Sequence, residues 1–179
     1  MERGGDTLGE MLKPQDIVVL LKLAVAQPGW TFMQVASELG LSTSAVHRSV
    51  ERAERAGLYD GFNRRPNRQA LLEFLSHGAR YVFPAVMQGE ARGFPTAWAA
   101  HPLSRELSFS THSIPVWPHA MGTERGIALA PLHSVVPEAS RKDAQLGELL
   151  ALFDAIRIGN ARERKLAIKL LAKALEGLR

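Results

Sequence analysis

Apolar residues recur with helical spacing in two segments close to the N-terminus. The first segment starts at Pro14, where a first helical turn tolerates the missing N–H, and stops before Pro28. The second follows Thr31, which has the capping-box spacing to Gln34, and ends at Gly40. The pattern therefore predicts two consecutive helices joined by a short connection.

A third apolar stripe follows Ser42, which can cap a helix, and ends at Gly57. Its apolar positions, which predict the inward face, are Ala45, Val46, Val50 and Ala53. Its polar positions, which predict the outward face, are His47, Arg48, Glu51, Arg52 and Arg55. We interpret Arg52 and Arg55 as solvated residues that pair with Glu51 and Glu54, because such spacing is common on exposed helix faces.

The segment after the third helix is polar and turn-rich. Leu58–Tyr59 can begin a strand, and Asn67 can cap a short helix over residues 68–76 that Gly78 closes. The run Arg80–Val86 is typical of another strand.

Prolines are too frequent between residues 89 and 137 for long helices, so we expect loops and small strands there, including Leu107–Phe109 and Ile127–Leu129. Leucine-rich amphipathic patterns then predict helices at Asp143–Ile158 and Ala161–Leu178. The break at Gly159 between them predicts a helical hairpin.

The charge balance fits a polyanionic partner without proving one. The chain has 22 Lys and Arg against 18 Asp and Glu, and seven arginines gather between residues 48 and 80. The absence of cysteine excludes disulfides and thiolate metal sites, and no apolar run is long enough to cross a bilayer. We therefore expect a soluble, cytoplasmic protein.

DNA recognition by a helix pair requires a steep helix crossing and a helix whose first turns enter a major groove roughly 12 Å wide. The stretch from Gln34 to Ala53, QVASELGLSTSAVHRSVERA, supplies a small residue at the crossing, a glycine turn and apolar anchors in the required order. It resembles the helix-turn-helix of winged-helix regulators of the multiple-antibiotic-resistance type. The resemblance covers about a quarter of the chain, and Ser49 departs from it because the family usually has an aliphatic anchor there.

The resemblance implies positions that contact base edges and phosphates, namely Ser42, Thr43, Ser44, His47 and Arg48. Their chemistry suits the task, since hydroxyls at a helix N-terminus can bind phosphate. Arg48 is the foremost candidate because a guanidinium can pair with O6 and N7 of guanine.

A wing normally follows such a helix as a strand, a basic loop and a return strand. We expect the first strand within Gly57–Phe62 and the return strand at Arg80–Phe83. The loop between them contains Arg64, Arg65 and Arg68, which are secondary candidates for contacts to phosphates or a narrow minor groove.

These patterns together predict an α+β, mainly helical chain. Residues 1–12 are expected to be a flexible N-terminus, residues 13–86 a winged helix-turn-helix DNA-binding domain, and residues 87–179 a companion domain. The companion domain is expected to hold a small irregular β region and the C-terminal helical pair.

The leading functional prediction is a sequence-specific transcription regulator that binds double-stranded DNA, acting as a homodimeric repressor. The alternative is an antitoxin-like protein that neutralises a partner protein through its C-terminal half and regulates its own operon. It is favoured by three stretches that resemble small prokaryotic winged-helix proteins, antitoxin-like ones among them: Arg80–Ala85, Arg92–Ala97 and Arg157–Arg164.

Enzymatic functions are less well supported by the sequence. Ser110, His112 and Asp143 could form a triad on paper, but no nucleophile-elbow glycines surround any serine. The middle histidines lack metal-ligand spacing; they are His101, His112, His119 and His133. We therefore expect no enzyme activity, no metal and no cofactor.

Overall fold

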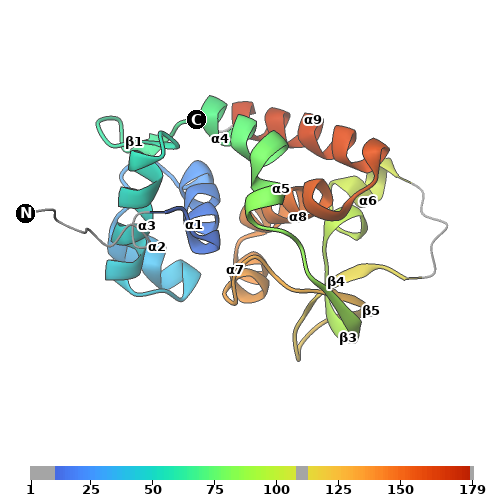
Figure 1. Ribbon diagram of the computed structural model, residues 1–179. Helices are drawn as coiled ribbons and strands as arrows, with labels where there is room; N and C mark the ends of the chain where they lie inside the picture. Colours follow the sequence, from blue (N-terminus) through green and yellow to red (C-terminus); the bar gives the residue numbers. More distant parts are fainter. Residues whose placement is uncertain (1–10, 108–112, 178–179) are drawn as a thin grey trace, which may run out of the picture.

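The computed structural model describes residues 11–107 and 113–177 (Figure 1). Most of the predicted flexible segment 1–12 and part of the strand predicted at Leu107–Phe109 lie outside these residues. The chain is α+β and mainly helical, as predicted. In chain order the elements are α1 (Pro14–Val25), α2 (Phe32–Leu39), α3 (Thr43–Arg55), β1 (Tyr59–Asp60), β2 (Arg65–Pro66), α4 (Arg68–Glu73), the π-helical turn η2 (Phe74–Gly78), α5 (Ala79–Val82), β3 (Met87–Pro95), the 3₁₀ turn η3 (Ala97–Ala99), α6 (Leu103–Glu106), β4 (Pro115–Pro118), β5 (Glu124–Leu129), α7 (Val136–Lys142), α8 (Ala144–Ile158) and α9 (Ala161–Gly177).

Helices α2 and α3 begin at the caps that the sequence predicts. The Thr31 hydroxyl accepts a hydrogen bond from the backbone N–H of Gln34 at 3.1 Å, and the Ser42 hydroxyl accepts one from Ala45 at 3.2 Å. The capping box also predicts that the Gln34 side chain reaches back to the backbone of Thr31. This part of the prediction is wrong, because the Gln34 side chain donates to Glu38 one turn further along α2. Each cap satisfies an N–H that has no partner within the helix.

Two glycines end the helices where the sequence predicts a stop. Gly40 has a φ of 69° and Gly57 a φ of 74°, a left-handed conformation that side chains with a Cβ rarely adopt. The chain therefore turns sharply between α2 and α3, and again between α3 and β1.

The return strand predicted at Arg80–Phe83, within the run Arg80–Val86, is wrong. β1 pairs instead with β2 as a short antiparallel hairpin, with Tyr59 opposite Pro66. Residues 68–82 are helical, through α4, η2 and α5, so Gly78 does not close the short helix that begins after Asn67.

The physical reason for this helical stretch is a repeat of four residues along its buried side. Its buried apolar members are Leu71, Leu75, Ala79 and Phe83. A helix places these four residues on one face, whereas a strand would bring Glu73 and His77 onto the same face, so burial of the apolar residues favours a helix.

The strands β3, β4 and β5 close into a small three-stranded barrel. β3 pairs with β4 and β5 in antiparallel fashion, and β4 and β5 run parallel to each other. Gly93 permits the closure, because a Cβ at that position would lie only 2.0 Å from the carbonyl oxygen of Trp117. The predicted strand Ile127–Leu129 lies within β5 and is confirmed, whereas the sequence did not predict α7.

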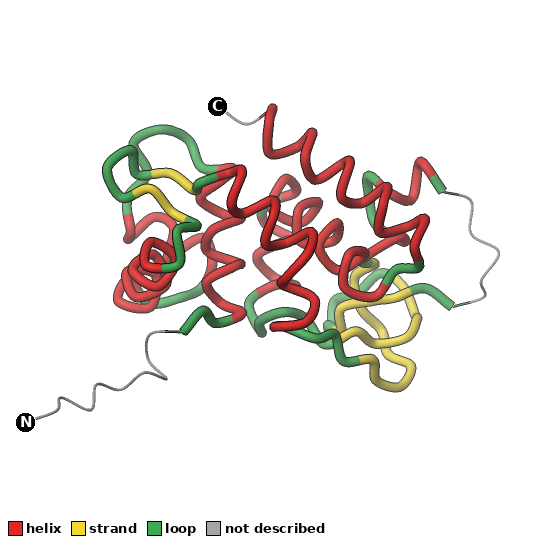
Figure 2. The backbone as a smooth tube through the Cα atoms, turned by 45° about the horizontal axis from the view of Figure 1, so that its top comes forward, coloured by secondary structure: helices red, strands yellow, loops and turns green. Residues whose placement is uncertain are grey.

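The predicted C-terminal helices are confirmed as α8 and α9. α8 is buried along almost its whole length and packs against α1, α7 and α9. One cluster of buried hydrophobic side chains extends from Ile17 in α1 to Leu175 in α9, so the two halves share a continuous core. Figure 2 shows the β1–β2 hairpin and the small barrel at opposite ends of the helical body.

Lys22 connects the N-terminal helices to the C-terminal half. Its ammonium group donates to Asp143 at 2.6 Å and forms an ion pair with Glu38. Asp143 also accepts from the backbone N–H of Leu146 and so caps α8. Asp143 thus has a structural role, while Ser110 and His112, its partners in the triad considered above, lie outside the described residues. No helix in the described ranges has the length and apolar character to span a membrane.

Candidate nucleic-acid interface

The start of α3 presents the hydroxyl residues that the sequence analysis singled out. Ser42, Thr43 and Ser44 are all exposed. The Ser42 hydroxyl is committed to capping Ala45 and lies 3.2 Å from the Ser44 hydroxyl. Accepting from Ala45 leaves the Ser42 proton available, so each of the three exposed hydroxyl groups can offer a donor to a phosphate when Ser42 and Ser44 do not donate to each other.

His47 and Arg48 follow on the outer surface of α3, and both are exposed. The imidazole of His47 stacks on Phe32, with ring centroids 3.5 Å apart and an interplanar angle of 17°. Phe32 in turn contacts the indole of Trp30 edge-on at 5.0 Å. The outer face of α3 is thus continuous with an aromatic cluster at the start of α2.

Arg52 does not lie on the solvated face to which the sequence analysis assigned it. Its guanidinium donates to both carboxylate oxygens of Asp16 in α1, and only 7% of its side chain is exposed. The buried hydroxyl of Ser49 accepts from Gln15, at 2.9 Å, as well as from Arg52. Ser49 is therefore part of a polar contact between α1 and α3. This explains why a serine stands at position 49, where the winged-helix regulators that the stretch resembles usually have an aliphatic residue.

The β1–β2 hairpin is tied to the segment that connects α1 and α2. The guanidinium of Arg64 lies 4.8 Å from the ring centre of Trp30 and donates to the Trp30 carbonyl, while the indole N–H donates to the Arg64 carbonyl. Arg64 has a φ of +52°, which costs energy in a residue with a Cβ. These contacts hold Arg64 in that conformation and link the hairpin, through Trp30 and Phe32, to His47.

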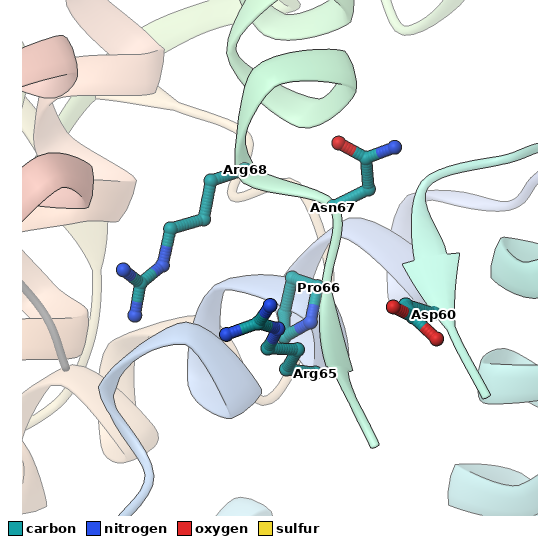
Figure 3. A pocket seen from close by; sticks show the side chains of 5 residues that line it. All are labelled: Asp60, Arg65, Pro66, Asn67 and Arg68. Atoms are coloured by element: carbon teal, nitrogen blue, oxygen red, sulfur yellow. The ribbon is translucent and has the colours of Figure 1, made fainter. Parts of the chain in front are cut away.

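Arg65 and Arg68 line a cavity of about 420 Å³ beside the hairpin, together with Asp60, Pro66 and Asn67. Figure 3 shows both arginine side chains extending to the same side of β2, with Asp60 on the neighbouring strand β1. Hydrogen bonds from Asn63 lower the pKa of Asp60, and the charge of Arg65 lowers it further. Asp60 is the partner of Arg65 in the register of the hairpin, and its carboxylate reduces the net positive charge there. The sequence analysis did not predict this strand pairing.

The eight predicted site residues lie in two groups, one at the start and on the outer face of α3, the other on the hairpin and its continuation into α4. The contacts among Arg64, Trp30, Phe32 and His47 link the two groups. Sequence reasoning missed Asp16, Trp30 and Phe32, which position these elements, and Phe62, which is exposed in the hairpin loop. The available signal for Phe62 was that it is the single aromatic residue in the run from Asp60 to Arg68.

The three middle histidines that the structure describes are not gathered into one site. His101 contacts Glu148 at 2.8 Å, and His119 lies 3.9 Å from Glu138, on separate elements. Burial lowers the pKa of His133, and His112 lies outside the described residues. Among the described residues, no group of three or more side chains is arranged to hold a metal ion.

Comparisons of the chain with protein-family models, with curated proteins and with solved structures return no match.

Proposed function

We propose that this protein is a transcription regulator that binds specific double-stranded DNA through a winged helix-turn-helix formed by α1–α3 and the β1–β2 hairpin. The observation that carries the proposal is the position of α3. Its outer face is polar and exposed at Ser44, His47 and Arg48, while the buried Arg52–Asp16 pair holds its inner face against α1. A recognition helix needs such a rigid support to place side chains against base edges.

In this proposal α3 enters the major groove and Arg48 pairs with a guanine through two hydrogen bonds. Thr43 and Ser44, at the start of α3, donate to backbone phosphates, where exposed N–H groups of the helix also favour an anion. Arg65 and Arg68 contact phosphates beside the groove and contribute affinity without reading sequence. Arg48 thus reads the sequence, while the helix start and the hairpin arginines position the protein on the phosphates.

The protein acts as a homodimer in this proposal, and as a repressor. A single recognition helix contacts few base pairs, whereas two helices on adjacent turns of DNA double the interface. Sedimentation of the full chain, alone and with DNA, measures this part separately from DNA binding.

The test begins with selection of duplexes from a random-sequence library by the wild-type protein. Arg48→Ala should weaken binding to a selected duplex by about 1–3 kcal/mol and relax the preference at one base position. Arg105→Ala removes the same charge from α6, in an exposed position on another element, and should leave affinity unchanged. Failure of the wild type to enrich any sequence, or equal affinity of Arg48→Ala and wild type, would contradict the proposal.

An antitoxin-like function is the second candidate, because four exposed hydrophobic residues occur along the chain from the end of α5 to the start of β3. They are Tyr81, Val82, Val86 and Met87. Apolar side chains gathered outside the proposed DNA interface are typical of a surface that binds a partner protein. Mass measurement of the protein purified from its native cells would detect a stoichiometric partner, and its absence would remove this candidate.

A further inference from the structure

Phe62 is the most exposed large hydrophobic residue in the described part of the chain, with 96% of its surface open to solvent. It occupies the loop between β1 and β2, where turn residues are ordinarily polar. A phenylalanine gains nothing from this position in the isolated protein, since burial of its ring would contribute about 1.5–3 kcal/mol. The residue is therefore a candidate for burial in a complex.

The loop that carries Phe62 is held by its own hydrogen bonds. The Asp60 carboxylate accepts from the backbone N–H of Asn63 at 3.0 Å and from its side-chain amide at 2.6 Å. On the other side of Phe62, the contacts of Arg64 with Trp30 anchor the return strand. Phe62 thus lies on a loop whose backbone is held by hydrogen bonds. The loop therefore loses little conformational entropy when Phe62 inserts into a partner.

The surroundings of Phe62 favour a polyanion as that partner. A hollow of about 410 Å³ separates the hairpin from the end of α1, and Phe62 lines it together with Trp30, Arg64, Arg65 and Arg68. Aromatic rings beside several guanidinium groups suit bases and phosphates, because rings stack on bases while arginines neutralise the backbone. The contacts from Arg64 through Trp30 and Phe32 to His47 connect this hollow to α3.

We propose that Phe62 is an apolar wedge that inserts from the minor groove into a base step of the duplex and bends the DNA. This inference rests on the proposed function, and it names the kind of duplex that the protein prefers. Wedge residues of this type partially unstack one step and kink the duplex by about 20–90°. Pyrimidine–purine steps unstack most readily, so such a step should occur beside the sequence that α3 reads.

The test uses a duplex selected by the wild-type protein, with 2-aminopurine at the steps flanking the selected sequence and fluorescent dyes at its two ends. Wild-type binding should raise the 2-aminopurine fluorescence at one step and shorten the end-to-end distance. Phe62→Ala should abolish both changes and weaken binding about tenfold, consistent with the loss of one aromatic–base stack. Phe62→Leu should retain part of both changes, because leucine also serves as a wedge.

Tyr81→Ala is the matched control, because it removes an exposed aromatic ring from α5 instead of the hairpin. It should behave as wild type in both fluorescence measurements, and the circular dichroism of every variant should match wild type.

If the wild type binds the duplex but leaves it stacked and straight, or if Phe62→Ala bends it equally, the wedge is overturned while the regulator proposal stands. If Arg48→Ala binds as wild type while Phe62→Ala loses affinity and bending, base reading by α3 fails and the wedge stands. If the wild type selects no duplex, both proposals fail.

Discussion

The guanidinium of Arg52 binds both oxygens of the Asp16 carboxylate, at 2.8 and 2.6 Å, between α1 and α3. The same carboxylate accepts from the backbone N–H of Lys13 and so helps to cap α1. One buried acid thereby fixes both the start of α1 and the rotation of α3 about its axis. The outward direction of Arg48 on α3 depends on this pair.

Removal of Asp16 should therefore destabilise the protein strongly. Asp16→Ala leaves the Arg52 charge buried without its partner, and we expect the free energy of unfolding to fall by about 3–5 kcal/mol. Urea denaturation followed by circular dichroism measures the change. Glu51→Ala, an exposed change on α3, should stay within about 0.5 kcal/mol of wild type.

The double variant Asp16→Leu/Arg52→Leu should recover much of the lost stability, because it removes both charges from the interior. A single variant Asp16→Ala as stable as Glu51→Ala would show that the pair does not hold α3.

The ion pairs of Lys22 with Glu38 and Asp143 predict a range of pH in which they stabilise the protein. Burial lowers the pKa of Lys22, but its hydrogen bonds to Asp143 and Glu38 outweigh burial and leave the pKa above 10.5. The hydrogen bond from Lys22, with another from Gln34, keeps the pKa of Glu38 below 4.5. The raised Lys22 pKa gives stability that is lost as pH rises beyond 10.5, and the lowered Glu38 pKa gives stability that is lost as pH falls below 4.5.

Lys22→Met should consequently reduce the free energy of unfolding by about 1–3 kcal/mol at neutral pH. The difference from wild type should shrink below pH 4.5 and above pH 10.5. Urea titrations across this range provide the measurement, and a difference that stays constant with pH would refute the assignment.

Asp154 should be as critical in the C-terminal half as Asp16 is in the N-terminal half. Its buried carboxylate accepts from the Thr96 hydroxyl, the Trp117 indole and the Arg157 guanidinium. Arg157 also donates to the carbonyls of Phe83 and Pro84, so the cluster joins α8 to the barrel and to the end of α5.

Asp154→Ala should lower stability by about 3–5 kcal/mol, because it leaves a buried guanidinium and two buried donors without their acceptor. Asp154→Asn keeps the shape and one acceptor oxygen and should cost less. Thermal unfolding compares the two, with Gln145→Ala as the control at an exposed position of α8. Equal melting temperatures for Asp154→Ala and the control would contradict the assigned role.

Replacing Arg65 and Arg68 with alanine should test phosphate contact. Each lost contact lowers the slope of log affinity against log salt concentration by about one, so the double variant should lose about two. Selected and random duplexes should weaken by similar factors. Arg105→Ala/Arg125→Ala removes the same charge from exposed positions on α6 and β5 and should retain the wild-type slope.

Binding titrations at several salt concentrations provide this measurement. A wild-type slope in the Arg65/Arg68 variant would mean that the hairpin arginines face solvent or a protein partner. Arg64 is left out of the variant, because its guanidinium packs on Trp30 and its removal would disturb the hairpin itself.

The local features of this chain could be predicted because each depends on residues close in sequence. The caps Thr31, Ser42 and Asn67 and the stops at Gly40 and Gly57 act within one helical turn, and all lie where the pattern placed them. The strand predicted at Arg80–Val86 failed for the opposite reason. Its apolar run suits a strand or a helix alone. The helix reaches Val82 because Ala79 and Phe83 are buried on the same face as Leu75, while Tyr81 and Val82 remain exposed.

The sequence by itself determined α1, α2, α3, α8 and α9, the caps of α2, α3 and α4, and the exposure of His47 and Arg48 on α3. Only the tertiary structure decided which charges are buried and which elements meet. Arg52 and Arg48 are four residues apart with the same side chain, yet one lies against Asp16 and the other in solvent. Likewise, Arg64 and Trp30 are 34 residues apart, and their contact sets the position of the hairpin. Such pairings depend on the free energy of packing distant segments together, which local sequence patterns do not encode.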